Sequence, residues 1–162
     1  MKEQIKVGMA DWNIASTGDV LKTTGLGSCV GLTLYDGAAQ LAGMAHIMLP
    51  SSDIARESDF NRAKYADTAF PDMLDRLIEK GASVRRMVAK LAGGAQMFAF
   101  AGQQDTMRIG PRNVETCKQL LEKYAIPLVG EDTGANYGRT IEFDSGTGVL
   151  TIRSVQYGTK EL

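Results

Sequence analysis

Two β-rich apolar runs separated by a short turn constrain the fold of this chain more than any other feature. They cover residues 28–36 and 40–49, and Asp36 and Gly37 begin the loop between them. Asp-Gly between such runs is typical of a β-hairpin. Antiparallel pairing about a loop centred near residue 38 places Cys29 opposite Ile47 and brings its thiol close to His46. The hairpin therefore predicts a contact between a thiol and an imidazole.

Cys29 ends a glycine-rich segment, TTGLGSC, at residues 23–29. Glycines at alternate positions let a backbone approach a ligand closely and direct its N–H groups into a concavity. Cysteine attacks as its thiolate, so the pKa of a reactive thiol must be lowered. An imidazolium at His46, the chain's single histidine, would lower it together with the nearby N–H groups.

These residues predict a cysteine hydrolase that attacks an amide carbon. The N–H groups of residues 27–29 would hold the oxyanion, and His46 would carry the proton to the leaving group and then activate water. A third group normally orients such a histidine, and Thr23 and Ser28 are both candidates.

Three alternatives stay open on the residues alone. In the first, Cys29 and His46 are ordinary core residues of a non-enzymatic adaptor. In the second, Cys29 is a redox sensor, for which the other cysteine, Cys117, is a poor resolving partner because it falls on the apolar face of a predicted helix. In the third, the same thioester passes to an amine instead of water, which is transamidation.

Composition narrows the class of protein. The 18 Lys and Arg residues nearly balance the 19 Asp and Glu residues, and no run of like charges suits nucleic acid. No apolar span approaches the ~18–20 residues that cross a membrane, and the first residues do not resemble a signal peptide. Cys29, His46 and Cys117 are fewer ligands than the four of a structural zinc site. We therefore expect a soluble cytoplasmic protein without metal or cofactor, nucleic-acid binding or membrane insertion.

The remaining pattern predicts one α+β domain, residues 1–162, with a mixed β-sheet. Helices are expected at about 61–80, kinked or broken at Phe70 because Pro71 lacks a donor, and from 110 to about 124. A strand is expected in the second half of 83–91 and a hairpin over 139–144 and 148–154, with fraying at 159–162. Arg139 and Arg153 are expected on solvated strand faces, and Phe98 and Phe100 are expected to be buried.

Several motifs together resemble the signature of the CheD family, the chemoreceptor glutamine deamidases of bacterial chemotaxis. The most specific are GLGSCV at residues 25–30 and AHIMLP at 45–50, in that order. Further matches are KYAD at 64–67, GGAQMF at 93–98, IGPRN at 109–113 and GRT at 138–140. The resemblance covers essentially the whole chain.

The resemblance implies hydrolysis of particular glutamine side-chain amides on the cytoplasmic helices of chemoreceptors, giving glutamate and ammonia and tuning adaptation. It implies Cys29 as the nucleophile, His46 as the general base and acid, and Thr23 as the group that orients the histidine. It also implies a layered α/β sandwich similar to toxin-type cysteine glutamine deamidases. The phosphatase CheC, which acts on the response regulator CheY, is the implied second partner.

Overall fold

Ten strands form two stacked five-stranded sheets in the computed structural model, which describes residues 2–55, 58–96 and 108–162. The first sheet has the order β1-β3-β8-β9-β10, formed by Gln4–Lys6, Val20–Leu26, Arg139–Asp144, Leu150–Ser154 and Gly158–Glu161. The second has the order β2-β5-β4-β6-β7, formed by Asp11–Ser16, Leu41–Ile47, Val30–Asp36, Met87–Gly93 and Leu128–Thr133.

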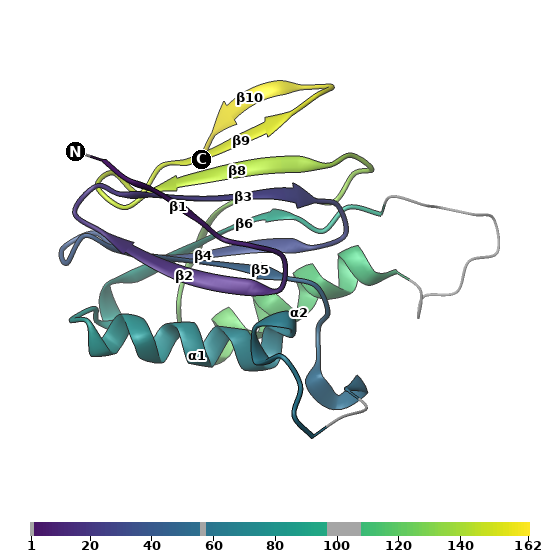
Figure 1. Cartoon of the computed structure of the whole chain (residues 1–162), viewed down its shortest axis with the longest axis horizontal. Helices are drawn as coiled ribbons and strands as arrows, with labels where there is room; N and C mark the ends of the chain where they lie inside the picture. Colours follow the sequence, from purple (N-terminus) through teal and green to yellow (C-terminus); the bar gives the residue numbers. More distant parts are fainter. Residues whose placement is uncertain (1, 56–57, 97–107) are drawn as a thin grey trace.

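Two helices cover the outer face of the second sheet, so the molecule has three layers (Figure 1). They are α1, Ala66–Glu79, and α2, Ile109–Lys123. Short 3₁₀ turns occupy Ser52–Ile54, Arg62–Lys64 and Val84–Arg86. The predicted α+β class is confirmed, but the prediction of one sheet is wrong. Strand patterns show which faces are buried, whereas the partner of each strand is chosen by tertiary packing.

Both sheets are mixed. β1 and β3 are parallel, as are β6 and β7, and the other neighbouring strands are antiparallel. The parallel β6–β7 connection runs through α2, as a crossover between parallel strands requires.

The predicted hairpin is formed by β4 and β5, but its register differs by one residue. Val30 pairs with Ile47 and Gly31 with His46, so Cys29 lies opposite Met48. The connection holds residues 37–40 and is therefore centred between residues 38 and 39. The one-residue change matters because it decides which side chains share a face.

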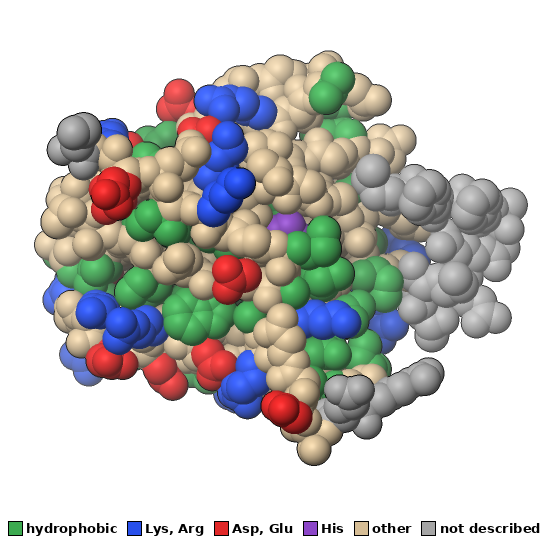
Figure 2. All heavy atoms as spheres, in the orientation of Figure 1, with side chains coloured by type: hydrophobic (Ala, Val, Ile, Leu, Met, Phe, Trp, Pro, Cys, Tyr) green, Lys and Arg blue, Asp and Glu red, His purple; other side chains and the backbone are tan. Residues whose placement is uncertain are grey.

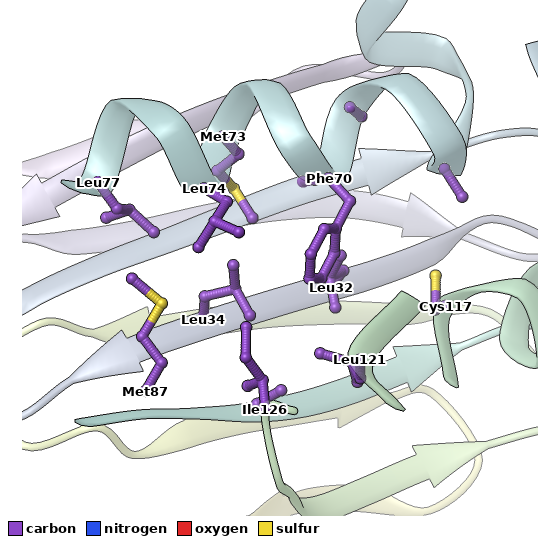
Figure 3. Close-up of a cluster of buried hydrophobic side chains, with 14 of the residues drawn as sticks. Leu32, Leu34, Phe70, Met73, Leu74, Leu77, Met87, Cys117, Leu121 and Ile126 are labelled. Atoms are coloured by element: carbon purple, nitrogen blue, oxygen red, sulfur yellow. The ribbon is translucent and has the colours of Figure 1, made fainter. Parts of the chain in front are cut away.

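Two hydrophobic cores lie on either side of the second sheet. The helix-side core contains Leu32 and Leu34 of β4 under Phe70 and Leu74 of α1 (Figure 3), and each such buried side chain contributes about 2 kcal/mol. The inter-sheet core lies between the two sheets and contains Leu21, Leu26, Cys29, Ala42, Met44, Ala92, Ile141, Phe143, Leu150 and Ile152. The strands of the second sheet thus send alternate side chains to different cores.

α1 begins later than predicted and is not broken at Phe70. It runs unbroken through Pro71 because Phe70, Met73, Leu74 and other residues of its apolar face are fully packed, which outweighs one missing backbone hydrogen bond. Gly81, with φ +115°, follows the end of the helix. Its N–H donates to Ile78 O, and the next N–H donates to Leu77 O.

Two predictions for the C-terminal region are wrong. Residues 159–161 belong to β10, and the backbone of Leu162 exchanges two hydrogen bonds with Leu150, so this end is held in the sheet. Arg139 is buried, pairs with Asp132 at 3.1 Å and lies 4.3 Å over the ring of Tyr137. The β8–β9 hairpin and the exposed Arg153 agree with the prediction.

Candidate active site

Thr23 and His46 meet in the inter-sheet layer. Thr23 Oγ1 lies 2.7 Å from His46 Nδ1, and both side chains are almost fully buried. Thr23 belongs to β3 of the first sheet and His46 to β5 of the second. On β5, His46 follows Ala42 and Met44, which also point into the inter-sheet core, because alternate residues of a strand share a face. Stacking of the sheets therefore creates this contact.

Cys29 lies in the same layer, immediately before β4. It is buried within the inter-sheet core, and its position two residues before Gly31 makes it a diagonal cross-strand neighbour of His46. Nε2 of His46 is buried and accepts no hydrogen bond from the described residues, the Cys29 thiol included. The structure thus joins Thr23 to His46 directly and places Cys29 on the same face.

Burial shifts the pKa values of both groups away from their charged forms. It raises the pKa of the Cys29 thiol above 9.0 and lowers the pKa of His46 below 6.5. Both directions favour a neutral thiol and a neutral imidazole over the thiolate–imidazolium pair that the sequence predicted. If Nδ1 carries the proton and donates to Thr23 Oγ1, Nε2 is left as a proton acceptor.

Three consecutive carbonyl groups anchor the Cys29 segment. Gly27 O accepts from Ala95 N at 2.9 Å, Ser28 O accepts from Asn113 Nδ2 at 3.0 Å, and Cys29 O accepts from Gly94 N at 2.8 Å. The N–H groups of Ser28 and Cys29 form no hydrogen bond with the described residues. Donors of this kind are what an oxyanion requires.

The glycine pair at residues 93–94 packs against the backbone of Cys29 and hydrogen-bonds to it. Gly93 has φ +98°, and a Cβ at this position would collide with Cys29 O. Gly94 has φ +66° and donates to the same oxygen. The positive φ angles of this pair suit glycine, and its contacts hold the Cys29 segment in place.

The second cysteine and the remaining residues that the sequence singled out lie away from the thiol–imidazole site or outside the described part of the chain. Cys117 is fully buried in the helix-side core, and burial raises its pKa to about 12. The second sheet therefore separates it from Cys29, which makes the predicted objection to a Cys29–Cys117 redox pair stronger. Phe98 and Phe100 lie outside the described residues. Asn113 was matched only as part of a motif, and its polar side chain on an otherwise apolar helix face was the signal that could have singled it out.

Within residues 2–55, 58–96 and 108–162, no three His, Cys, Asp or Glu side chains gather as metal ligands. No helix in this described part is both long and apolar enough to span a bilayer. Lys and Arg side chains are interspersed with Asp and Glu over the face shown in Figure 2, so this face carries no large patch of one sign.

A two-sheet α+β protein with a buried threonine–histidine pair beside a cysteine has the residue types of a thiol hydrolase. The sequence model described as CheD chemotactic sensory transduction matches residues 48–154. The chain is 52% identical over 162 residues to the chemoreceptor glutamine deamidase CheD of Halalkalibacterium halodurans, covering 100% of both chains. It is 51% identical over 158 residues to the protein of that name from Bacillus subtilis, covering 98% of this chain and 95% of the relative. The chain belongs to the CheD family.

The family match leaves out the three candidate site residues, whereas the alignment with a full-length relative includes them. The match begins at Met48, after Thr23, Cys29 and His46. The alignment with the Halalkalibacterium halodurans protein spans the whole chain and therefore includes these three positions.

Proposed function

We propose that this chain is a protein-glutamine deamidase that acts on glutamines in the cytoplasmic helices of chemoreceptors during chemotactic adaptation. The names of its full-length relatives support this activity and substrate. In this proposal residues 1–162 form one deamidase domain that works in the cytoplasm, with Cys29 as nucleophile, His46 as base and acid, and Thr23 as the orienting group. The observation that carries the assignment is the Thr23–His46 hydrogen bond, with a buried Nε2 that has no partner among the described residues.

The first half of the reaction forms a thioester. Cys29 Sγ attacks the carboxamide carbon of the glutamine while its proton passes to Nε2 of His46. Because burial favours the neutral form of both groups, deprotonation of the thiol accompanies the attack. The N–H groups of Ser28 and Cys29 hold the oxyanion. His46 then gives its proton to the amide nitrogen, the C–N bond breaks, and ammonia leaves.

The second half uses water. His46 accepts a proton from water, the hydroxyl oxygen attacks the thioester carbon, and collapse of the intermediate breaks the C–S bond to give glutamate. The proton on His46 returns to the thiol. The Sγ–Nε2 contact forms when substrate binds, because catalytic hydrogen bonds are often long in substrate-free enzymes.

Two further elements of the proposal rest on the family resemblance. One is that the layered fold is shared with toxin-type cysteine glutamine deamidases. The other is that the CheC phosphatase is a second binding partner. Co-purification of CheC with the wild-type chain tests this second element, and absence of binding at micromolar concentrations would refute it.

The direct test incubates the chain with a chemoreceptor cytoplasmic fragment and follows glutamine-to-glutamate conversion by peptide mass spectrometry. We expect conversion and ammonia release by the wild type and none by Cys29→Ala. Cys117→Ala is the matched control, because it removes a buried thiol from the other core and should retain activity. Full activity of Cys29→Ala would refute the thiol mechanism. Amine adducts on adding putrescine would instead indicate transamidation, and receptor binding without conversion would indicate an adaptor.

A further inference from the structure

Asn113 is a polar side chain buried beneath the candidate site. It projects from α2 and is fully buried, and its Nδ2 lies 3.0 Å from Ser28 O and 2.9 Å from Met48 O. Carbonyl oxygens only accept hydrogen bonds, so the atom between them must be the amide nitrogen. Both of its protons are therefore used.

These two hydrogen bonds lie just beyond the end of the β4–β5 ladder. The last pair of that ladder is Val30 and Ile47. Ser28 directly precedes the Cys29 nucleophile of the proposed function, and Met48 lies two residues after His46. Asn113 thus joins the two segments where the strand hydrogen bonds stop.

The bond to Ser28 O also fixes the direction of a neighbouring donor. The carbonyl of Ser28 and the N–H of Cys29 belong to one planar trans peptide unit, in which they point in opposite directions. Because the carbonyl points toward Asn113, the Cys29 N–H points away from α2. This N–H group has no partner among the described residues.

The amide oxygen of Asn113 carries an energetic penalty. Oδ1 is buried and accepts no hydrogen bond from the described residues. The same side chain supplies the donor for Ser28 O and Met48 O, and an apolar residue of similar size would leave both carbonyl groups without that donor. The side chain therefore fits a role in directing Ser28 better than a role in packing.

We propose that Asn113 is a positioning residue, which orients the Ser28–Cys29 peptide unit so that the Cys29 N–H receives the oxyanion formed on the glutamine carboxamide. This inference rests on the proposed function. It predicts a specific defect, because only reactions that form an oxyanion need that donor.

Two reagents that act on Cys29 separate this role from general damage to the site. In acylation by p-nitrophenyl acetate, the thiol proton passes to His46, an S–C bond forms through an oxyanion intermediate, and p-nitrophenolate leaves. Iodoacetamide alkylates the same sulfur: the thiol proton again passes to His46, an S–C bond forms, and iodide leaves without an oxyanion. Cys29→Ala supplies the background rate, and fully buried Cys117 is protected from both reagents.

The test compares Asn113→Leu with the wild type, and Asn113→Ala repeats it without a bulky side chain. We expect acylation and deamidation to fall about 10²-fold, the usual effect of losing one oxyanion donor, with alkylation close to the wild-type rate. Thr33→Val is the matched control, because it removes a buried hydroxyl of β4 that donates to Lys90 O of β6, and it should change neither rate.

Each other outcome has a definite meaning. Acylation at the wild-type rate in both Asn113 variants would overturn the inference. Equal loss of acylation and alkylation would also overturn it, since that result indicates collapse of the Cys29 segment. A wild type that reacts at Cys29 with both reagents but leaves receptor glutamines unchanged would refute the proposed function. The ratio of the acylation rates of the Asn113 variants and the wild type would then still test the role of Asn113. A wild type inert to both reagents would refute both proposals.

Discussion

Burial decides which protonation states are available to the residues of the candidate site. His46 has one ring nitrogen bonded to Thr23 and the other without a partner among the described residues. Its lowered pKa favours the neutral ring, which can accept a proton, and the raised pKa of Cys29 favours the protonated thiol. The mechanism therefore depends on a single tautomer of one imidazole.

Thr23→Val tests that dependence at constant side-chain volume. Loss of the hydroxyl removes one buried hydrogen bond, worth about 1 kcal/mol, which corresponds to roughly a fivefold to tenfold lower kcat. The nitrogen-15 NMR signals of the only histidine should show a shift from one tautomer to a mixture. Thr33→Val is again the control. Unchanged kcat and an unchanged tautomer would mean that Thr23 does not orient His46.

At the scale of elements, the site depends on how the hairpin of β4 and β5 is held at both of its ends. At one end, Asn113 and the glycine turn after β6 bind the Cys29 segment. At the other end, the side chain of Asp36 accepts from the N–H groups of Ala39 and Ser83 and pairs with Arg86 at 2.9 Å. The carboxylate of Asp36 thus ties the turn of the hairpin to the start of β6.

Asp36→Ala is expected to lower the free energy of unfolding by about 3 kcal/mol, because it leaves two N–H groups and a guanidinium without their partner. Asp72→Ala, which breaks the exposed Arg62–Asp72 pair, should cost less than about 1 kcal/mol. Urea unfolding of the two variants and the wild type measures both values. Equal effects would mean that burial of the Asp36 cluster adds nothing.

At the scale of the whole molecule, one histidine buried between two sheets links folding to pH. Burial lowers the pKa of folded His46 below 6.5, so the unfolded chain binds its proton more readily. The contribution of neutral His46 to the free energy of unfolding is fully present above the pKa of the unfolded histidine. It is lost as the pH falls below that pKa. The pKa of Asp36 is also low, because hydrogen bonds from Arg86, Ser83 and Ala39 outweigh the opposing effect of burial. Protonation of Asp36 therefore lowers the free energy of unfolding only at a more acidic pH than protonation of His46 does.

We therefore expect the wild-type free energy of unfolding to fall between about pH 7 and about pH 5, a window in which histidine titrates and carboxylates stay ionised. His46→Gln should flatten the curve in this window, because no other histidine exists in the chain. Urea titrations at several pH values measure the slope. A slope that persists in His46→Gln would assign the effect to other groups.

The sequence by itself determined the local parts of this protein. The apolar runs and Asp36-Gly37 predicted the β4–β5 hairpin. The remaining pattern predicted a helix where α1 lies and the β8–β9 hairpin. Each of these depends on residues close together in the chain, whose pattern and turn chemistry act locally. The sequence also predicted that Cys29, His46 and Thr23 form the candidate active site.

Only the tertiary structure decided the remaining features, because each depends on groups that are distant in sequence. The first sheet is built from strands at both ends of the chain, and its stacking brings Thr23 to His46. Burial between the sheets raises the pKa of Cys29 and lowers that of His46, which opposes the charged pair that the sequence predicted. A side chain on α2, Asn113, reached Ser28 across 85 residues, and packing kept α1 continuous where the sequence predicted a kink or break at Phe70. Spacing along the chain carries no information about such contacts, since folding alone sets their geometry and dielectric environment.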